Sequence, residues 1–236
     1  MTKRKITDGA REGPESPAKT LKRVKSNEKA AGSPKSSQNI KSTDHNQDSR
    51  NQNNKDNDRT LIIHEKQADL FAAPPHTLLI HACNTQGHWG AGIALAFKRH
   101  YPFAFKEYAA HCTTHKQPKP KQHSLTGTAL LISPASNTDD KDRRFVGCLF
   151  TSAGYGRRKD SKAAILANTK AAMTDLMGKV GEWNERKEEG ERIEEVWMCR
   201  INAGLFNVAW EETRAVLESV EVPEGLSREV VVVSKD

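Results

Sequence analysis

The sequence predicts an α/β domain with a mixed, largely parallel central sheet, and three patterns support this fold class. Apolar runs of strand length alternate along the chain with segments of helical periodicity, as in sheets built from parallel strands and crossover helices. Three of these runs end in glycine-rich loops, and a low-complexity segment precedes all of them. The 236 residues therefore hold one folded domain behind an N-terminal extension.

The extension is predicted to be a disordered basic tail over residues 1–58, with the folded domain over residues 59–236. The tail is rich in Lys, Ser, Asn, Gln, Asp and Pro and has few large apolar side chains, so it cannot bury enough surface to offset its ordering entropy. Residues 1–59 carry 14 of the 37 Lys and Arg and 8 of the 30 Asp and Glu, which is +6 of the net charge of +7. The domain is nearly neutral, which argues against stable nucleic-acid binding by it.

Two basic runs of the tail, Lys3–Lys5 and Lys22–Lys25, leave two interpretations open. A nuclear import receptor reads such runs, and the simpler alternative is a solvated extension without a partner. No apolar stretch has the length of a signal peptide core or a membrane span, and the four cysteines include no Cys-x-x-Cys pair. We expect an intracellular protein in a reduced compartment, in the cytoplasm, the nucleus or both, without membrane association.

The expected strands are six short runs: 61–64, 77–81, 126–132, 145–151, 193–201 and 230–233. Four helices are expected. The first begins near Gly92, and the second begins at Pro102, where a proline suits the first turn of a helix. The third follows Ser161 as its N-cap and ends near Met177, and the fourth begins at Val208.

Two further segments are expected on the surface. The charged segment Val180–Arg192 is predicted to be an extension between a helix and a strand. His111, His115 and His123 are assigned to a basic loop broken by prolines. Because these histidines lack carboxylate partners, we expect no metal site there.

The first glycine-rich loop follows the run that ends at His81. Gly87, Gly90 and Gly92 lead into a segment with Ile93 and Phe97 four residues apart, as on one helix face. The free N–H groups at the start of such a helix favour an anion, most often a phosphate. The spacing fits neither the dinucleotide fingerprint nor the nucleoside triphosphate loop, and taken alone a tight turn explains the glycines equally well.

The two other glycine-rich loops, 152–156 and 202–206, favour the phosphate interpretation. In an open α/β sheet, loops at the carboxyl ends of the strands gather at one edge. Three such loops indicate an extended ligand, with Trp89, Tyr155 and Phe206 available to cover its flat or apolar parts.

Four segments carry motifs in the same order along residues 60–236: Ala68–Phe71, Ile80–Asn84 with Trp89–Ala94, Leu149–Gly156, and Ile201–Phe206. They resemble the macrodomains, a family that binds ADP-ribose, and are most similar to fungal ADP-ribose 1″-phosphate phosphatases. The resemblance implies a three-layer α/β/α domain that hydrolyses the 1″-phosphate of ADP-ribose 1″-phosphate, a tRNA-splicing by-product. We expect no cofactor and assign no metal ligand. The alternatives are an ADP-ribosyl-protein hydrolase and a non-catalytic ADP-ribose-binding module.

The resemblance also implies roles for individual residues. Asp69 would accept from the adenine amino group, and Asn84 would bind the distal ribose. His81 would act as the catalytic acid or base, with Asp160 as a second candidate. Each has a structural alternative, since Asp69 can be a turn residue, His81 a satisfied hydrogen-bonding residue and Asp160 the residue before a helix cap. The implied ligand-binding residues are Ala68, Asp69, Leu70, Ala82, Cys83, Asn84, Trp89, Gly90, Ala91, Gly92, Ile93, Ala94, Ser152, Ala153, Gly154, Tyr155, Gly156, Ile201, Asn202, Ala203, Gly204, Leu205 and Phe206.

Overall fold

The computed structural model describes residues 59–115 and 125–234. The predicted tail and His123 lie outside the described residues. The elements in chain order are β1 (Ile62–Gln67), η1 (Leu70–Ala72), β2 (Thr77–Asn84), α2 (Gly92–His100), α3 (Pro102–His115), β3 (Ala129–Ile132), η2 (Asp140–Asp142), β4 (Phe145–Ser152), η3 (Gly156–Arg158), α4 (Lys162–Arg186), η4 (Glu189–Glu191), β5 (Glu195–Cys199), α5 (Trp210–Leu217) and β6 (Glu229–Ser234).

The six strands form one sheet in the order β1-β6-β5-β2-β4-β3. All neighbours are parallel except β3 and β4, so the prediction of a mixed, largely parallel sheet is confirmed. Because β2, β4 and β5 run in the same direction, their carboxyl ends share one edge of the sheet. The three glycine-rich loops leave from that edge.

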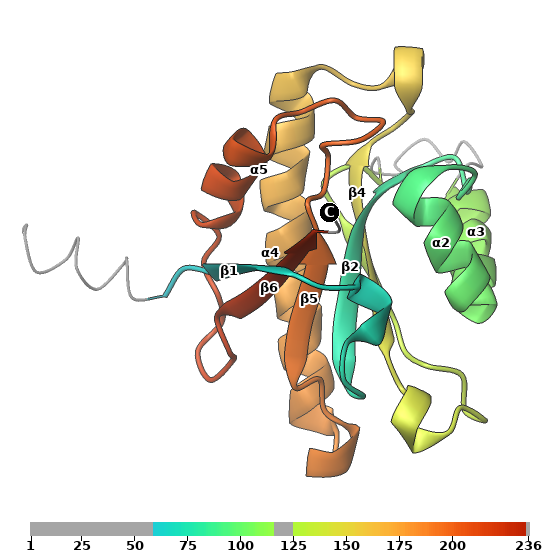
Figure 1. Cartoon of the computed structure of the whole chain (residues 1–236), viewed down its shortest axis with the longest axis vertical. Helices are drawn as coiled ribbons and strands as arrows, with labels where there is room; N and C mark the ends of the chain where they lie inside the picture. The colour runs from blue at the N-terminus through green and yellow to red at the C-terminus, as the bar shows by residue number, and fades with distance from the viewer. Residues whose placement is uncertain (1–58, 116–124, 235–236) are drawn as a thin grey trace, which may run out of the picture. The chain divides into compact units, whose positions relative to one another are not determined.

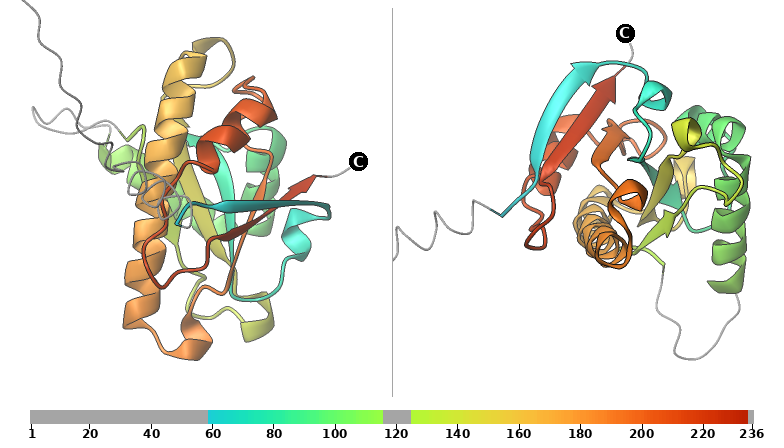
Figure 2. Two further views of the ribbon diagram at one scale, coloured as in Figure 1. Left: turned by 90° about the vertical axis from the view of Figure 1, so that its left-hand side faces the viewer. Right: turned by 90° about the horizontal axis from the view of Figure 1, so that it is seen from below.

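Helices cover both faces of the sheet, as a three-layer α/β/α domain requires. Figure 1 shows α4 and α5 on one side of β2 and β4 and α2 and α3 on the other, and the turned views in Figure 2 agree. Strand β4 is therefore covered by helices on both of its faces, and all eight of its residues are buried. This explains why its sequence lacks the apolar–polar alternation of a half-exposed strand.

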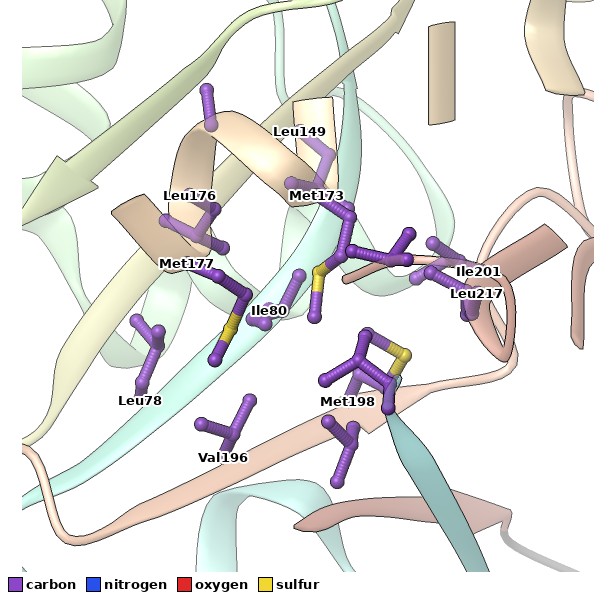
Figure 3. Close-up of a cluster of buried hydrophobic side chains, with 14 of the residues drawn as sticks. Leu78, Ile80, Leu149, Met173, Leu176, Met177, Val196, Met198, Ile201 and Leu217 are labelled. Carbon is purple, nitrogen blue, oxygen red and sulfur yellow. The ribbon is translucent and has the colours of Figure 1, made fainter. Parts of the chain in front are cut away.

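Alternate residues of β2 enter two different cores. Leu78 and Ile80 join the core beneath α4 and α5, whereas Leu79 and Cys83 join the core beneath α2 and α3. Figure 3 shows the first core, in which side chains of α4 meet those of the sheet and of α5. Its labelled members are Leu78, Ile80, Leu149, Met173, Leu176, Met177, Val196, Met198, Ile201 and Leu217.

The prediction for Val180–Arg192 is wrong, because α4 continues to Arg186 and its last two turns are packed. Val180 and Gly181 are buried. The Nε1 of Trp183 donates to the carbonyl oxygen of Glu191 at 3.0 Å, which brings the following segment back onto the helix. Charged side chains occupy the outer side of these turns, and their density hid the inner apolar residues.

The loop predicted for the histidines is also wrong where the structure describes it. His111 and His115 lie on α3, with ring centroids 4.3 Å apart. In the part of the chain that the structure describes, no helix combines the length and apolar character needed to cross a membrane.

Candidate functional site

A cavity of about 500 Å³ opens at the carboxyl edge of the sheet. The loops that follow β2, β4 and β5 all contribute to it, as the sequence predicts. Its lining residues are Ala82, Asn84, His88, Gly90, Ala91, Gly92, Ile93, Ala94, Tyr155, Cys199, Arg200, Ile201, Asn202, Gly204, Leu205 and Phe206. An elongated ligand can thus contact three loops at once.

Asn84 holds the first loop closed. Its Nδ2 donates to the carbonyl oxygen of His88 at 2.9 Å, and its Oδ1 accepts from the backbone N–H of Gln86 at 2.8 Å. From beneath, the Tyr108 hydroxyl donates to the Asn84 carbonyl oxygen at 2.7 Å. The amide of Asn84 is therefore a structural group of the loop as well as a cavity-lining one.

The N-terminus of α2 supplies free N–H groups to the cavity wall. The N-cap residue, Ala91, has no side chain that can accept from them, and the first backbone bond of the helix comes only from the Leu95 N–H. Gly92 has φ +55°, a region that favours glycine. Uncapped N–H groups at the positive end of a helix dipole bind anions such as a diphosphate.

Asp160 shapes the second loop. Its Oδ2 accepts from the Ala153 N–H at 2.8 Å, and its own N–H donates to the Ser152 Oγ at 2.9 Å. A Cβ at Gly154 would lie 2.3 Å from the carbonyl oxygen of Arg158, so this turn requires glycine. Asp160 does not line the cavity, and the structure gives it a role in loop geometry.

Asn202 anchors the third loop to β4 and α4. Its Oδ1 accepts from the Thr151 Oγ1 at 3.0 Å and its Nδ2 donates to the Thr169 Oγ1 at 2.9 Å, all in buried positions. It adopts φ +64°, which asparagine tolerates better than most residues. The nearby Phe206 lines the cavity and Leu205 stands 53% exposed at it.

Arg200 brings a positive charge to the lining. Its Nη2 donates to the Glu65 carboxylate at 2.8 Å, and Arg214 and Trp210 donate to the other carboxylate oxygen. The bond from Trp210, followed by the charges of the two arginines, lowers the pKa of Glu65. Arg200 is thus held in place by an ion-pair network that ties β5 to β1.

Sequence reasoning missed three lining residues: His88, Cys199 and Arg200. Cys199 and Arg200 directly precede the fourth motif segment, Ile201–Phe206, and His88 lies between two glycines of the first loop, so proximity to the motifs was the available signal. Burial raises the pKa of Cys199 to about 12, which keeps its thiol protonated at neutral pH.

Ten predicted ligand-binding residues do not line this cavity: Ala68, Asp69, Leu70, Cys83, Trp89, Ser152, Ala153, Gly154, Gly156 and Ala203. Asp69 lies after β1, where its Oδ1 accepts from the Phe71 N–H at 3.1 Å as the N-cap of η1. Trp89 is 1% exposed and stacks on Tyr108 with ring centroids 4.8 Å apart, so it packs in the core and does not cover the ligand.

His81 is also outside the cavity, contrary to the position expected of a catalytic residue. It is completely buried, stacked on Phe97 with ring centroids 4.2 Å apart and packed edge-on against Trp89. The strand alternation that sends Ala82 and Asn84 to the cavity sends His81 to the core beneath α2 and α3. This geometry does not support direct contact between His81 and a reacting phosphate.

The same core brings His81, Cys83 and Cys148 together, with ligand-type atoms within 4.8 Å of one another. The Cys83 Sγ lies 3.5 Å from His81 Nε2 and 3.6 Å from Nδ1. Because the Cys83 sulfur is nearly equally far from the two ring nitrogens of His81, it does not lie along the lone pair of either nitrogen. The arrangement is that of packed side chains, and burial raises the pKa of Cys83.

Comparisons with known proteins agree with this fold and site. A family model described as "Macro domain" matches residues 80–217. A protein of Chaetomium globosum named ADP-ribose 1″-phosphate phosphatase is 50% identical over 168 residues, covering 70% of this chain and 87% of the relative. One of the same name from Aspergillus clavatus is 42% identical over 192 residues, covering 73% and 94%.

Among solved structures, the macrodomain of Thermus aquaticus DarG superposes with a TM-score of 0.53 at 21% identity, covering 73% of this chain and 98% of that one. This likeness supports the fold. Together with the family model and the close relatives, it shows that the chain belongs to the macro domain family.

Proposed function

We propose that this protein is a phosphatase that hydrolyses ADP-ribose 1″-phosphate to ADP-ribose and inorganic phosphate. The observation that carries the proposal is a cavity with an uncapped helix N-terminus in its wall, built from three strand exits, in a chain whose relatives of that name match over most of their length. Macro domains bind ADP-ribose, and the substrate adds one phosphate to its distal ribose.

The cavity has the parts that such a substrate needs. The uncapped N–H groups of Gly92 and Ile93 suit the diphosphate, because they supply positive partial charge without mobile side chains. Ala82, Ile201 and Phe206 give apolar surface for the adenine and ribose carbons. Arg200 adds guanidinium N–H donors to the lining, although its charge is paired with Glu65.

The lining also limits the chemistry. A cysteine nucleophile must be a thiolate, and Cys199 keeps its proton at neutral pH. We therefore assign the attack on phosphorus to water, with the rate increase coming from substrate positioning and from oriented N–H groups that stabilise the charge on the transferring phosphoryl oxygens.

The test uses the full-length protein, two substrates and one ligand. Phosphate release is measured with ADP-ribose 1″-phosphate, ADP-ribose release is measured with an ADP-ribosylated protein, and ADP-ribose binding is measured by calorimetry on the same preparation. The proposal expects phosphate release and ADP-ribose binding. Release of ADP-ribose from protein without phosphate release would instead indicate a hydrolase of modified proteins, and binding without either reaction would indicate a recognition module.

A further inference from the structure

His88 is a histidine of the cavity wall to which the proposed function gives no role. We propose that the His88 imidazole contacts the 1″-phosphate group and donates a proton to the sugar oxygen that leaves. This inference rests on the proposed phosphatase function. It takes the catalytic role that the sequence motif favours for His81, which lies in the core behind this wall.

The backbone of His88 is fixed on both sides. Its carbonyl oxygen accepts from the Asn84 Nδ2 at 2.9 Å, and the next residue, Trp89, is 1% exposed and stacked on Tyr108. The Cα of His88 is therefore held between a closed loop and an anchored indole. A side chain on such a rigid support can be aimed at a ligand without a large ordering cost.

The ring of His88 is available, unlike the other candidates. His88 is exposed and lines the cavity, and within the described residues its ring makes no hydrogen bond or ion pair. The Asp160 carboxylate is instead bound to the Ala153 N–H, and His81 is enclosed by aromatic rings.

The other ionisable side chains of the lining are less suited to proton transfer than an imidazole. A guanidinium such as that of Arg200 offers donors but no acceptor, and burial raises the pKa of the Cys199 thiol to about 12. Imidazole is the side chain suited to acid and base transfer there, and such transfer typically contributes about 10²–10⁴-fold to a rate.

His88 also lies at the correct end of the site for this reaction. It lies in the loop that Asn84 closes and precedes Gly90–Gly92, where the uncapped helix N-terminus can receive an anion. The family resemblance implies that Asn84 binds the distal ribose. The 1″-phosphate is attached to that ribose. A proton donor on this loop can therefore reach the bond that breaks.

In the proposed step, a water oxygen forms a bond to phosphorus while the bond between phosphorus and the 1″ oxygen breaks. That 1″ oxygen keeps the electron pair of the broken bond and takes the imidazolium proton of His88. The products are the free 1″-hydroxyl of ADP-ribose and inorganic phosphate. The proton lost by the attacking water restores the imidazolium.

The experiment compares His88→Gln with the wild-type full-length protein, using His64→Gln as the matched control. His64 is an exposed histidine on β1, where it contacts Glu229 and lies outside the cavity. The His88→Gln variant is expected to lower kcat by about 100-fold or more while the Kd for ADP-ribose, which lacks the 1″-phosphate, changes by less than about threefold. The control is expected to match the wild type in both.

The pH profile separates acid catalysis from phosphate binding. For a general acid, kcat falls as pH rises and the imidazolium loses its proton, and this limb is absent in His88→Gln. An unchanged kcat, or a raised KM with kcat retained, would overturn the proposal. A wild-type protein that binds ADP-ribose but releases no phosphate would remove the phosphatase function itself, and the assignment of His88 with it.

Discussion

Asp160 offers a sharp separation between loop geometry and chemistry. The structure gives its carboxylate one clear task, to accept the Ala153 N–H at 2.8 Å and so hold the loop after β4 against the cavity. Asp160→Ala removes this acceptor. Asp160→Asn keeps an oxygen in the same place but removes the negative charge and the ability to exchange a proton.

The magnitude follows from the type of bond. A hydrogen bond to a charged group contributes about 1.5–3 kcal/mol. We take about 1–2 kcal/mol for this one, because Asp160 is partly exposed. Since about 1.4 kcal/mol is tenfold in affinity, Asp160→Ala is expected to weaken ADP-ribose binding by about 5- to 30-fold. Asp160→Asn retains a neutral bond of about half the strength and is expected to weaken binding by less than about fivefold.

Calorimetry with ADP-ribose and turnover of ADP-ribose 1″-phosphate measure both effects on each variant. The structural role requires that kcat of Asp160→Asn stay within about tenfold of the wild type. If Asp160→Asn binds ADP-ribose normally but loses about 100-fold or more in kcat, the carboxylate takes part in proton transfer and a purely structural role for Asp160 is refuted.

Three further changes test the support of the site. Gly154→Ala places a Cβ 2.3 Å from the Arg158 carbonyl oxygen, and the forced loop shift is expected to cost about 1–3 kcal/mol of stability and to weaken ADP-ribose binding, so an unchanged Tm and Kd would contradict the close approach. Tyr108→Phe leaves the buried Asn84 carbonyl oxygen without its donor, which should lower the free energy of unfolding in urea by about 1–3 kcal/mol. Glu65 has a folded pKa below its usual 4.5, so its ionised form stabilises the fold above that value and the contribution is lost as pH falls through the folded pKa. Glu65→Gln should therefore cost about 1 kcal/mol at about pH 7 and progressively less below about pH 4.5, and a pH-independent difference would exclude the ion-pair explanation.

The fold was predictable because its signals are local. Each strand is a short apolar run and three of them exit through glycine, so the class of fold, the shared edge and the position of the cavity all follow from the sequence. The strand order does not follow, because crossover connections leave several orders open. The length of α4 was missed because charged residues on its outer side outnumber the inner apolar ones near Val180.

The assignment of individual site residues was harder for a physical reason. Strand β2 is covered on both faces, so its sequence carries no alternation that tells which side chains face the cavity. A histidine is a common catalytic residue, which favoured His81 as the acid or base. The alternation of side chains along β2 instead directs Ala82 and Asn84 to the cavity. The Trp89 side chain is a similar case, since an aromatic residue in a glycine loop can cover a ligand or anchor the loop, and in this structure the indole packs in the core.

The central claim is that the cavity at the ends of β2, β4 and β5 is where ADP-ribose 1″-phosphate is hydrolysed, and filling the cavity tests it most directly. Ala91 is exposed in the cavity wall, so Ala91→Trp adds a large side chain there with little effect on the core, and Ala110→Trp on the exposed side of α3 is the matched control. We predict that phosphate release by Ala91→Trp falls by at least about tenfold, equivalent to about 1.4 kcal/mol, while the control retains the wild-type rate. Full phosphate release by a folded Ala91→Trp protein would contradict the account and place the reaction elsewhere on the molecule.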